Sequence, residues 1–149
     1  MKFYIASSLC NGGMVQSIAG YFTSRGWEQT YDWTEHGAVS NMDELERVSD
    51  EELRGVTGCD LFFLLLPGGR GSHTELGAAL AAKKPVFILS LDQDLFYEAG
   101  LTCSFYHHPG VHNRIIERDW YALACLAFRE GRKCLWKGKR LSRIKEAAQ

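Results

Sequence analysis

The residue types with the clearest chemical potential are concentrated in the run Pro67–Gly77, which reads PGGRGSHTELG. Its anion-binding candidates are Gly69, Arg70, Gly71 and Ser72. Glycines let main-chain N–H groups approach an anion closely, and an arginine adds a charge-assisted hydrogen bond to a phosphate. A helix that begins at Ser72 would present its positive end to the same anion. The pattern predicts a phosphate-binding loop, with the carboxylate of Glu75 in the first turn of the helix that follows.

Glu75 also has a purely structural interpretation. Ser72 and Glu75 have the spacing of a capping box, in which the carboxylate accepts a hydrogen bond from the serine N–H. Glu52 has the same ambiguity, because Ser49 precedes it by three residues. The spacing alone leaves both glutamates open between a helix cap and chemistry.

Two other ligand classes are disfavoured. The glycine run resembles the dinucleotide-binding fingerprint with Thr74 in place of its last glycine, but that fingerprint opens the first strand–helix unit and this loop lies in mid-chain. Three closely spaced histidines resemble a metal cluster: His107, His108 and His112. Their spacing across a Pro-Gly pair gives them no common helical face, and no acid or cysteine completes a ligand set. The sequence predicts neither a cofactor nor a metal.

Alternating strand and helix patterns position these residues. The expected strands are 3–6, 27–33, 60–66, 85–89 and 103–107, and the expected helices are 14–25, 49–58, 72–83 and 113–129. Residues 34–48 are polar and irregular, which is typical of a loop or a short helix. Strands that are apolar throughout and alternate with helices indicate a parallel sheet covered on both faces. We therefore expect a small doubly wound α/β domain, Rossmann-like or flavodoxin-like, with about five strands.

The expected sheet places two loops at one edge. Residues 7–13 and 67–71 each follow the carboxyl end of a strand, and both contain paired glycines. In open parallel sheets, ligands bind beyond the carboxyl ends of the strands, near the point where strand order reverses. The two loops are therefore expected to form one site.

Composition limits the partners. The chain has 149 residues, 46% of them hydrophobic, and a net charge of −1, so we expect one domain over residues 1–149 and no nucleic-acid partner. No apolar run is long enough to span a bilayer, and the first residues read as a strand rather than a signal peptide. A small molecule is the expected partner, and the membrane is not.

The five cysteines are odd in number and form no Cys-x-x-Cys pair, which favours reduced, mostly buried thiols and a cytoplasmic location. The basic segment 130–149 is interpreted as a solvated terminal helix.

Over roughly residues 2–90, the chain resembles the nucleoside 2-deoxyribosyltransferases and the related nucleotide 5′-monophosphate N-glycosidases. The resemblance is carried by KFYIAS at residues 2–7, CD with its apolar strand at 59–66, TELGAALA at 74–81 and KPV at 84–86. The glutamate of the Glu-Leu-Gly element is the family's nucleophile and attacks the anomeric carbon. The resemblance therefore implies that Glu75 has this role.

The family also has a carboxylate eight residues before the central-strand aspartate, a position that Glu52 occupies relative to Asp60. The resemblance implies that Glu52 protonates the departing base or positions the sugar, although aspartate is usual there. The substrate-binding residues implied are Tyr4, Ser7, Ser8, Asn11, Gly12, Gly69, Arg70, Gly71 and Ser72, with Trp33 and Phe62 as further candidates for base stacking. Related proteins often complete their sites across a subunit contact, so a homodimer or larger homo-oligomer is expected.

Two departures from the transferases favour hydrolysis of a nucleoside 5′-monophosphate over base exchange. Gly69 stands where the transferases carry a further aspartate, so a carboxylate that would repel a phosphate is missing. Residues 11–13 (Asn-Gly-Gly) are similar to the glycine-rich opening loop of the nucleotide-hydrolysing relatives.

Two alternatives remain. The loop is also similar to the Pro-Gly-Gly-x-Gly-Thr-x-x-Glu motif of the cytokinin-activating phosphoribohydrolases, which cleave the same kind of bond. A non-catalytic module that binds or senses a nucleotide would use the same residues.

Overall fold

The computed structural model describes the backbone of residues 1–147 and the side chains of residues 1–136. The expected basic segment 130–149 is therefore described to residue 147 by its backbone and to residue 136 by its side chains. Within the described chain, parallel strands form a five-stranded sheet in the order β2-β1-β3-β4-β5. These are β1 (Lys2–Ala6), β2 (Glu28–Gln29), β3 (Leu61–Leu65), β4 (Val86–Ser90) and β5 (Val111–Ile116). The fold class is the predicted one, a doubly wound parallel α/β sheet.

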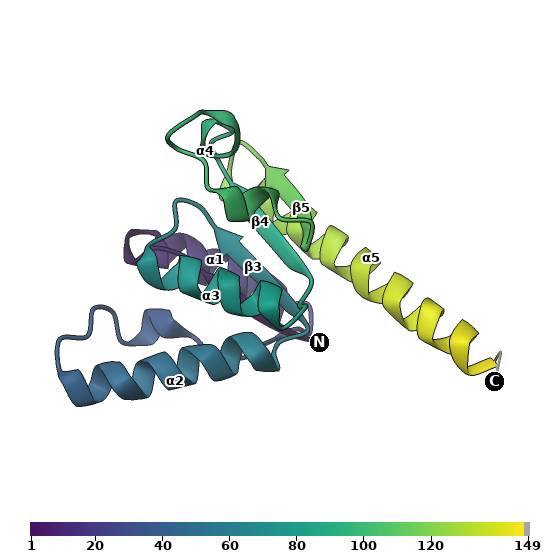
Figure 1. Ribbon diagram of the computed structural model, residues 1–149, viewed down its shortest axis with the longest axis horizontal. Helices are drawn as coiled ribbons and strands as arrows, with labels where there is room; N and C mark the ends of the chain where they lie inside the picture. The colour runs from purple at the N-terminus through teal and green to yellow at the C-terminus, as the bar shows by residue number, and fades with distance from the viewer. Residues whose placement is uncertain (148–149) are drawn as a thin grey trace.

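Helices cover both faces of this sheet. They are α1 (Gly12–Thr23), α2 (Met42–Gly58), α3 (Arg70–Ala81), α4 (Asp94–Tyr97) and α5 (Trp120–Ala147), with short 3₁₀ turns η1 (Leu9–Asn11), η2 (Trp33–Glu35) and η3 (Ser104–His107). Helices α1 and α5 pack against each other, and so do α2 and α3. Figure 1 shows α2 and α3 lying side by side, with α5 running past the sheet.

Alternation along the central strands assigns each residue to one face. Phe3 and Phe63 contact Phe22 of α1, at ring-centroid distances of 5.1 and 5.2 Å. Tyr4, the next residue of β1, points the opposite way and stacks on Phe62 at 5.9 Å, on the α2–α3 face. Strands β1, β3 and β4 are almost entirely buried, because both of their faces are covered. The buried hydroxyl of Tyr4 on this second face matters for the site.

Helix α2 is longer than predicted. It begins at Met42 rather than near Ser49, and Asn41 caps it by accepting a hydrogen bond from Asp43 N at 3.0 Å. Its first two turns are almost entirely exposed, and charged residues separate the apolar Met42, Leu45 and Val48 in the sequence. The segment 34–48, expected as a loop or a short helix, is therefore partly helix.

The C-terminal elements also differ from the prediction. Residues 104–107 form η3 rather than a strand, and the last strand is β5, six residues of which only Ile115 is buried. Its exposure as an edge strand hides it from a search for apolar runs. Helix α5 begins at Trp120 rather than at residue 113. At this start, Asp119 Oδ1 accepts a hydrogen bond from Ala122 N at 2.8 Å.

Two smaller expectations have mixed outcomes. The expected second strand, 27–33, shortens to Glu28–Gln29. Of the five cysteines, all free, only Cys59 is buried, so the expectation of mostly buried thiols is wrong. Among the described residues, no helix is long and apolar enough to cross a membrane.

Candidate active site

The candidate site lies where the strand order reverses. The chain leaves β1 toward α1 on one face and leaves β3 toward α3 on the other, so the two loops diverge at the carboxyl edge of the sheet. A cleft of about 440 Å³ opens there. The cleft is lined by Ser7, Ser8, Leu9, Trp33, Gly37, Ala38, Val39, Leu45, Val48, Ser49, Glu52, Gly69, Arg70, Gly71, Ser72 and Glu75. It therefore brings both predicted carboxylates and the glycine loop together.

Hydrogen bonds hold the two loops in place. Asn11 Nδ2 donates to Ser7 Oγ at 2.9 Å and to Pro67 O at 3.0 Å. Ser7 Oγ in turn donates to Leu65 O at 2.8 Å. Asn11 does not line the cleft, so in this structure its side chain joins the first loop to the second.

Glu75 is not a helix cap. Helix α3 begins at Arg70 with Gly69 as its N-cap, which places Glu75 in the second turn. Ser72 Oγ donates to Gly69 O at 2.9 Å. The expected helix start at Ser72 is wrong by two residues, and the capping interpretation fails with it.

The Glu75 carboxylate lies at the wall of the cleft with 6% of the residue exposed. Tyr4 Oη donates a hydrogen bond to Glu75 Oε1, and among the described residues Oε2 has no hydrogen-bond donor. Tyr4 itself is fully buried behind Glu75 and does not line the cleft. In this structure Tyr4, expected to bind substrate, contacts the Glu75 carboxylate and not the cleft itself.

Burial raises the pKa of Glu75 to about 7. The hydrogen bond from Tyr4 opposes this rise, and the charge of Glu52 adds to it. Burial and the neighbouring Glu75 also raise the pKa of Tyr4, so its phenol remains a donor. A carboxylate with a pKa near neutrality at the wall of a cleft is typical of a functional site.

Glu52 approaches the cleft from α2. It is half-buried, and burial raises its pKa, while the charge of His36 opposes the rise. Because α2 begins at Met42, Ser49 and Glu52 lie inside the helix, and Ser49 Oγ donates to Glu46 O at 2.8 Å. The capping interpretation of Glu52 therefore fails as well.

The glycines of the second loop differ in how much space a side chain would have. Gly69 has φ −95° and ψ −173°, an extended conformation open to any residue, and a Cβ there would lie 3.9 Å from Ser8 Cα. A Cβ on Gly71 would meet nothing within 4 Å. A Cβ on Gly68, in contrast, would lie 2.8 Å from Ser72 Oγ. Only Gly68 is needed for packing, so the other two leave open space beside the cleft.

The start of α3 offers unpaired donors. Within the described part of the chain, the main-chain N–H groups of Arg70, Gly71 and Ser72 have no hydrogen-bond acceptor. These are the orphan donors of a helix N-terminus, and they lie where the same residues line the cleft. The Arg70 side chain is exposed and makes no ion pair with any described residue.

The other residues predicted to contact a ligand do not all line the cleft. Ser7 and Ser8 line the cleft, whereas Gly12 lines an adjoining hollow of about 350 Å³. Trp33 lines both spaces, and its Nε1 donates to Ile5 O at 2.7 Å. Phe62 is fully buried against Tyr4, so it is not available for stacking on a base.

Sequence reasoning missed the face of α2 that closes the cleft. Leu45, Val48 and Glu52 line it together, and their spacing of three and four residues marks one helical face. The signal was present in the sequence but was hidden by the charged residues between them.

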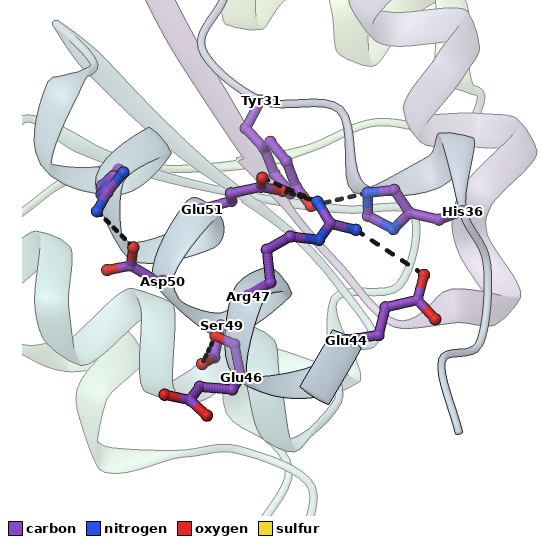
Figure 2. A network of polar contacts seen from close by, with 9 residues as sticks. Tyr31, His36, Glu44, Glu46, Arg47, Ser49, Asp50 and Glu51 are labelled. Carbon is purple, nitrogen blue, oxygen red and sulfur yellow. Dashed lines mark hydrogen bonds and ion pairs between the residues drawn. The ribbon is translucent and has the colours of Figure 1, made fainter. Parts of the chain in front are cut away.

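A polar network on the outer side of α2 fixes the segment that follows β2, as Figure 2 shows. Tyr31 Oη and His36 Nε2 are 2.7 Å apart, and Arg47 Nη1 donates to both carboxylate oxygens of Glu51, at 2.8 and 2.9 Å. Burial, followed by Glu51, raises the pKa of Tyr31 to about 12. The network joins residues 31–36 to the helix that carries Glu52.

Solved structures share this fold. A Clostridium botulinum CMP N-glycosidase, BcmB, aligns with a TM-score of 0.61 and 17% identity over 87% of this chain and 99% of its own. The solution structure of BlsM aligns with a TM-score of 0.66 and 15% identity over 87% of this chain and 90% of its own. No protein-family model matches the chain, and no curated protein matches its sequence. At these identities the likeness establishes the fold.

Proposed function

We propose that this protein hydrolyses the N-glycosidic bond of a nucleoside 5′-monophosphate. The observation that carries the proposal is the buried Glu75 carboxylate, held by Tyr4 at the wall of a cleft that also contains the free N–H groups of α3. The fold shared with a CMP N-glycosidase supports the proposal.

Glu75 is the nucleophile and Glu52 the general acid of the first chemical step. Glu75 Oε2 attacks C1′, the bond from C1′ to the base nitrogen breaks, and its electron pair goes to the base. Glu52 gives its proton to the departing base, a role that its place on α2, lining the same cleft as Glu75, allows. The product is a glycosyl ester on Glu75, as in retaining glycosidases.

Water completes the reaction. It attacks C1′ of the ester while the Glu52 carboxylate accepts its proton, and the bond from C1′ to Glu75 breaks. The carboxylate of Glu75 returns to its hydrogen bond with Tyr4. One water is consumed, and the free base and the sugar phosphate leave.

The spacing along α3 suits a phosphorylated substrate. Arg70 opens the helix and Glu75 follows five residues later, which is a rise of about 7.5 Å along the axis. That span is of the order of the separation between the anomeric carbon of a sugar and its 5′-phosphate. The N–H groups of Arg70 and Gly71 and the Arg70 guanidinium then bind the phosphate while Glu75 faces C1′.

The test is release of free base from a panel of ribo- and deoxyribonucleosides and their 5′-monophosphates, measured by chromatography. The wild-type protein is expected to release base from at least one monophosphate. Glu75→Gln is nearly isosteric and is expected to lower the rate by more than about 10³-fold, because the amide cannot form the ester. Full activity of this variant would overturn the nucleophile assignment.

Helix α2 supplies a matched control pair in the same assay. Glu52→Gln is expected to lower the rate by about 10²-fold, because it removes the acid. Glu46→Gln changes an exposed residue of the same helix that does not line the cleft, and it is expected to retain the wild-type rate. Calorimetric binding of a monophosphate with no base release by the wild type would select the non-catalytic binding module instead.

A further inference from the structure

His73 lies beside the cleft without lining it, yet both of its ring nitrogens are engaged. Nδ1 is 2.6 Å from Gly69 O, and Nε2 is 2.7 Å from Tyr106 Oη. The two rings stack with centroids 5.7 Å apart. His73 therefore joins the glycine loop to the segment between β4 and β5.

The partners determine the tautomer of His73. A carbonyl oxygen only accepts hydrogen bonds, so Nδ1 must carry the proton and donate to Gly69 O. In the neutral ring, Nε2 then accepts, and the Tyr106 hydroxyl donates to it. Burial raises the pKa of Tyr106 to about 12, so the phenol keeps the proton that it donates.

Tyr106 is a firm anchor for this contact. The residue is 4% exposed, and its ring packs edge-on against Phe96 with centroids 6.0 Å apart. Arg114 Nη1, from β5, donates to Tyr106 O at 2.8 Å. The imidazole is thus held from the side opposite the loop.

Three donors converge on the Gly69 oxygen: His73 Nδ1 at 2.6 Å, Ser72 Oγ at 2.9 Å and His73 N at 3.2 Å. The C=O of Gly69 and the N–H of Arg70 belong to one trans peptide and point in opposite directions. Fixing the oxygen toward the helix therefore fixes the N–H outward, where Gly69 and Arg70 line the cleft. A Cβ on Gly68 would lie 3.0 Å from His73 Cε1, so this glycine makes room for the ring.

We propose that His73 is a positioning residue that, through the Gly69 carbonyl and with Tyr106 as its anchor, orients the Gly69–Arg70 peptide toward the phosphate of the substrate. The inference rests on the proposed function, since it assigns the phosphate to that peptide. His73 touches neither the substrate nor the reacting atoms.

Amide substitutions at His73 distinguish the contribution of Nδ1 from that of Nε2. The side-chain nitrogen of His73→Asn lies near the place of Nδ1 and keeps the donor to Gly69 O, whereas His73→Gln reaches the place of Nε2 and loses that donor. We expect His73→Gln and His73→Ala to raise KM for the monophosphate about tenfold, with kcat changed less. We expect His73→Asn to stay within about twofold of the wild type. KM for the corresponding nucleoside should change in none of them.

A merely structural role predicts a different pattern, in which all three variants lose activity on both substrates in proportion to their loss of thermal stability. That result, or an unchanged KM for the monophosphate in His73→Gln, would overturn the inference. Tyr106→Phe provides a second route should His73 variants fail to fold, with an expected rise in KM of a few-fold for the monophosphate alone. An unchanged KM in that variant would contradict the claim that Tyr106 holds the His73 ring in place.

Calorimetry with a monophosphate on the wild-type protein distinguishes failure of the inference from failure of the proposed function. If the wild type neither binds the monophosphate nor releases its base, the proposed function fails. If it does both and His73→Gln binds as tightly, the proposed function stands and the role of His73 is wrong.

Discussion

At the scale of single residues, Gly69 and Gly68 lack a side chain for different reasons. Its φ and ψ are extended and its missing Cβ would lie in ordinary contact range of Ser8 Cα, so another residue is tolerated there. Gly68 differs, because a side chain there would collide with Ser72 and His73. Packing thus explains the lack of a side chain at Gly68 but not at Gly69, where we attribute it to the proposed phosphate.

Gly69→Asp tests that explanation. The variant is expected to fold, because neither strain nor a steric clash opposes the new side chain. Its carboxylate would lie beside the proposed phosphate position, so KM for the monophosphate should rise about 10²-fold through like-charge repulsion. Activity on the nucleoside, measured by the same release of base, should be retained.

Gly69→Asn is the control for size, because it has nearly the same shape without the charge. A smaller rise in KM than in Gly69→Asp is expected. An equal rise in the two variants would show that space rather than charge excludes the monophosphate, and an unchanged KM in both would remove the phosphate from this loop.

At the scale of elements, α2 decides where Glu52 lies. Gly55, one turn after Glu52, packs so closely that a Cβ there would lie 2.9 Å from both Tyr31 Cβ and Tyr4 Cε2. The helix therefore contacts the same tyrosine that holds Glu75. One glycine brings the two carboxylates to one cleft.

Gly55→Ala is expected to destabilise the fold by about 1–3 kcal/mol, because the methyl group overpacks against the two tyrosines. Base release should fall as well, since relief of the clash moves α2 and Glu52 away from the sheet. The matched control is Gly58→Ala in the same helix, where a Cβ meets nothing within 4 Å and φ is not positive. Chemical denaturation and the base-release assay check both variants, and equal stability of the two would contradict the close packing of α2.

The same elements show what a sequence can predict. Strands β1, β3 and β4 were predicted because both of their faces are buried and their residues are apolar throughout. The start of α2 is missed because charged residues separate its apolar residues Met42, Leu45 and Val48, and β5 is missed because it is an exposed edge.

The candidate site follows the same rule. Glu75 and its loop are contiguous and carry a recognisable pattern. They are expected to form one site with the loop 7–13, of which Ser7 and Ser8 line the cleft while Asn11 and Gly12 do not. The contact of His73 with Tyr106 joins residues 33 positions apart, across an element that was itself misassigned. Contacts of that kind depend on tertiary packing, which local patterns do not encode.

At the scale of the whole molecule, a buried carboxylate affects the stability of the entire fold. Glu75 has a pKa of about 7 in the folded protein, against its ordinary value of 4.5. Between these values, the folded state binds a proton that the unfolded state has released. Stability associated with Glu75 is therefore fully present below about pH 4.5 and is lost as pH rises through about 7.

The loss is measurable as a difference between two proteins. At about 1.4 kcal/mol per pKa unit, the shift corresponds to about 3 kcal/mol of unfolding free energy. Denaturant unfolding of the wild type and of Glu75→Gln from pH 4.5 to 8 should give curves that diverge by this order, with the wild type losing stability relative to the variant. Glu51 and Glu130, whose pKa values are lowered by neighbouring cations, act in the opposite sense but are present in both proteins and largely cancel. Parallel curves would mean that Glu75 is ionised at little cost, and the burial argued for the nucleophile would then be wrong.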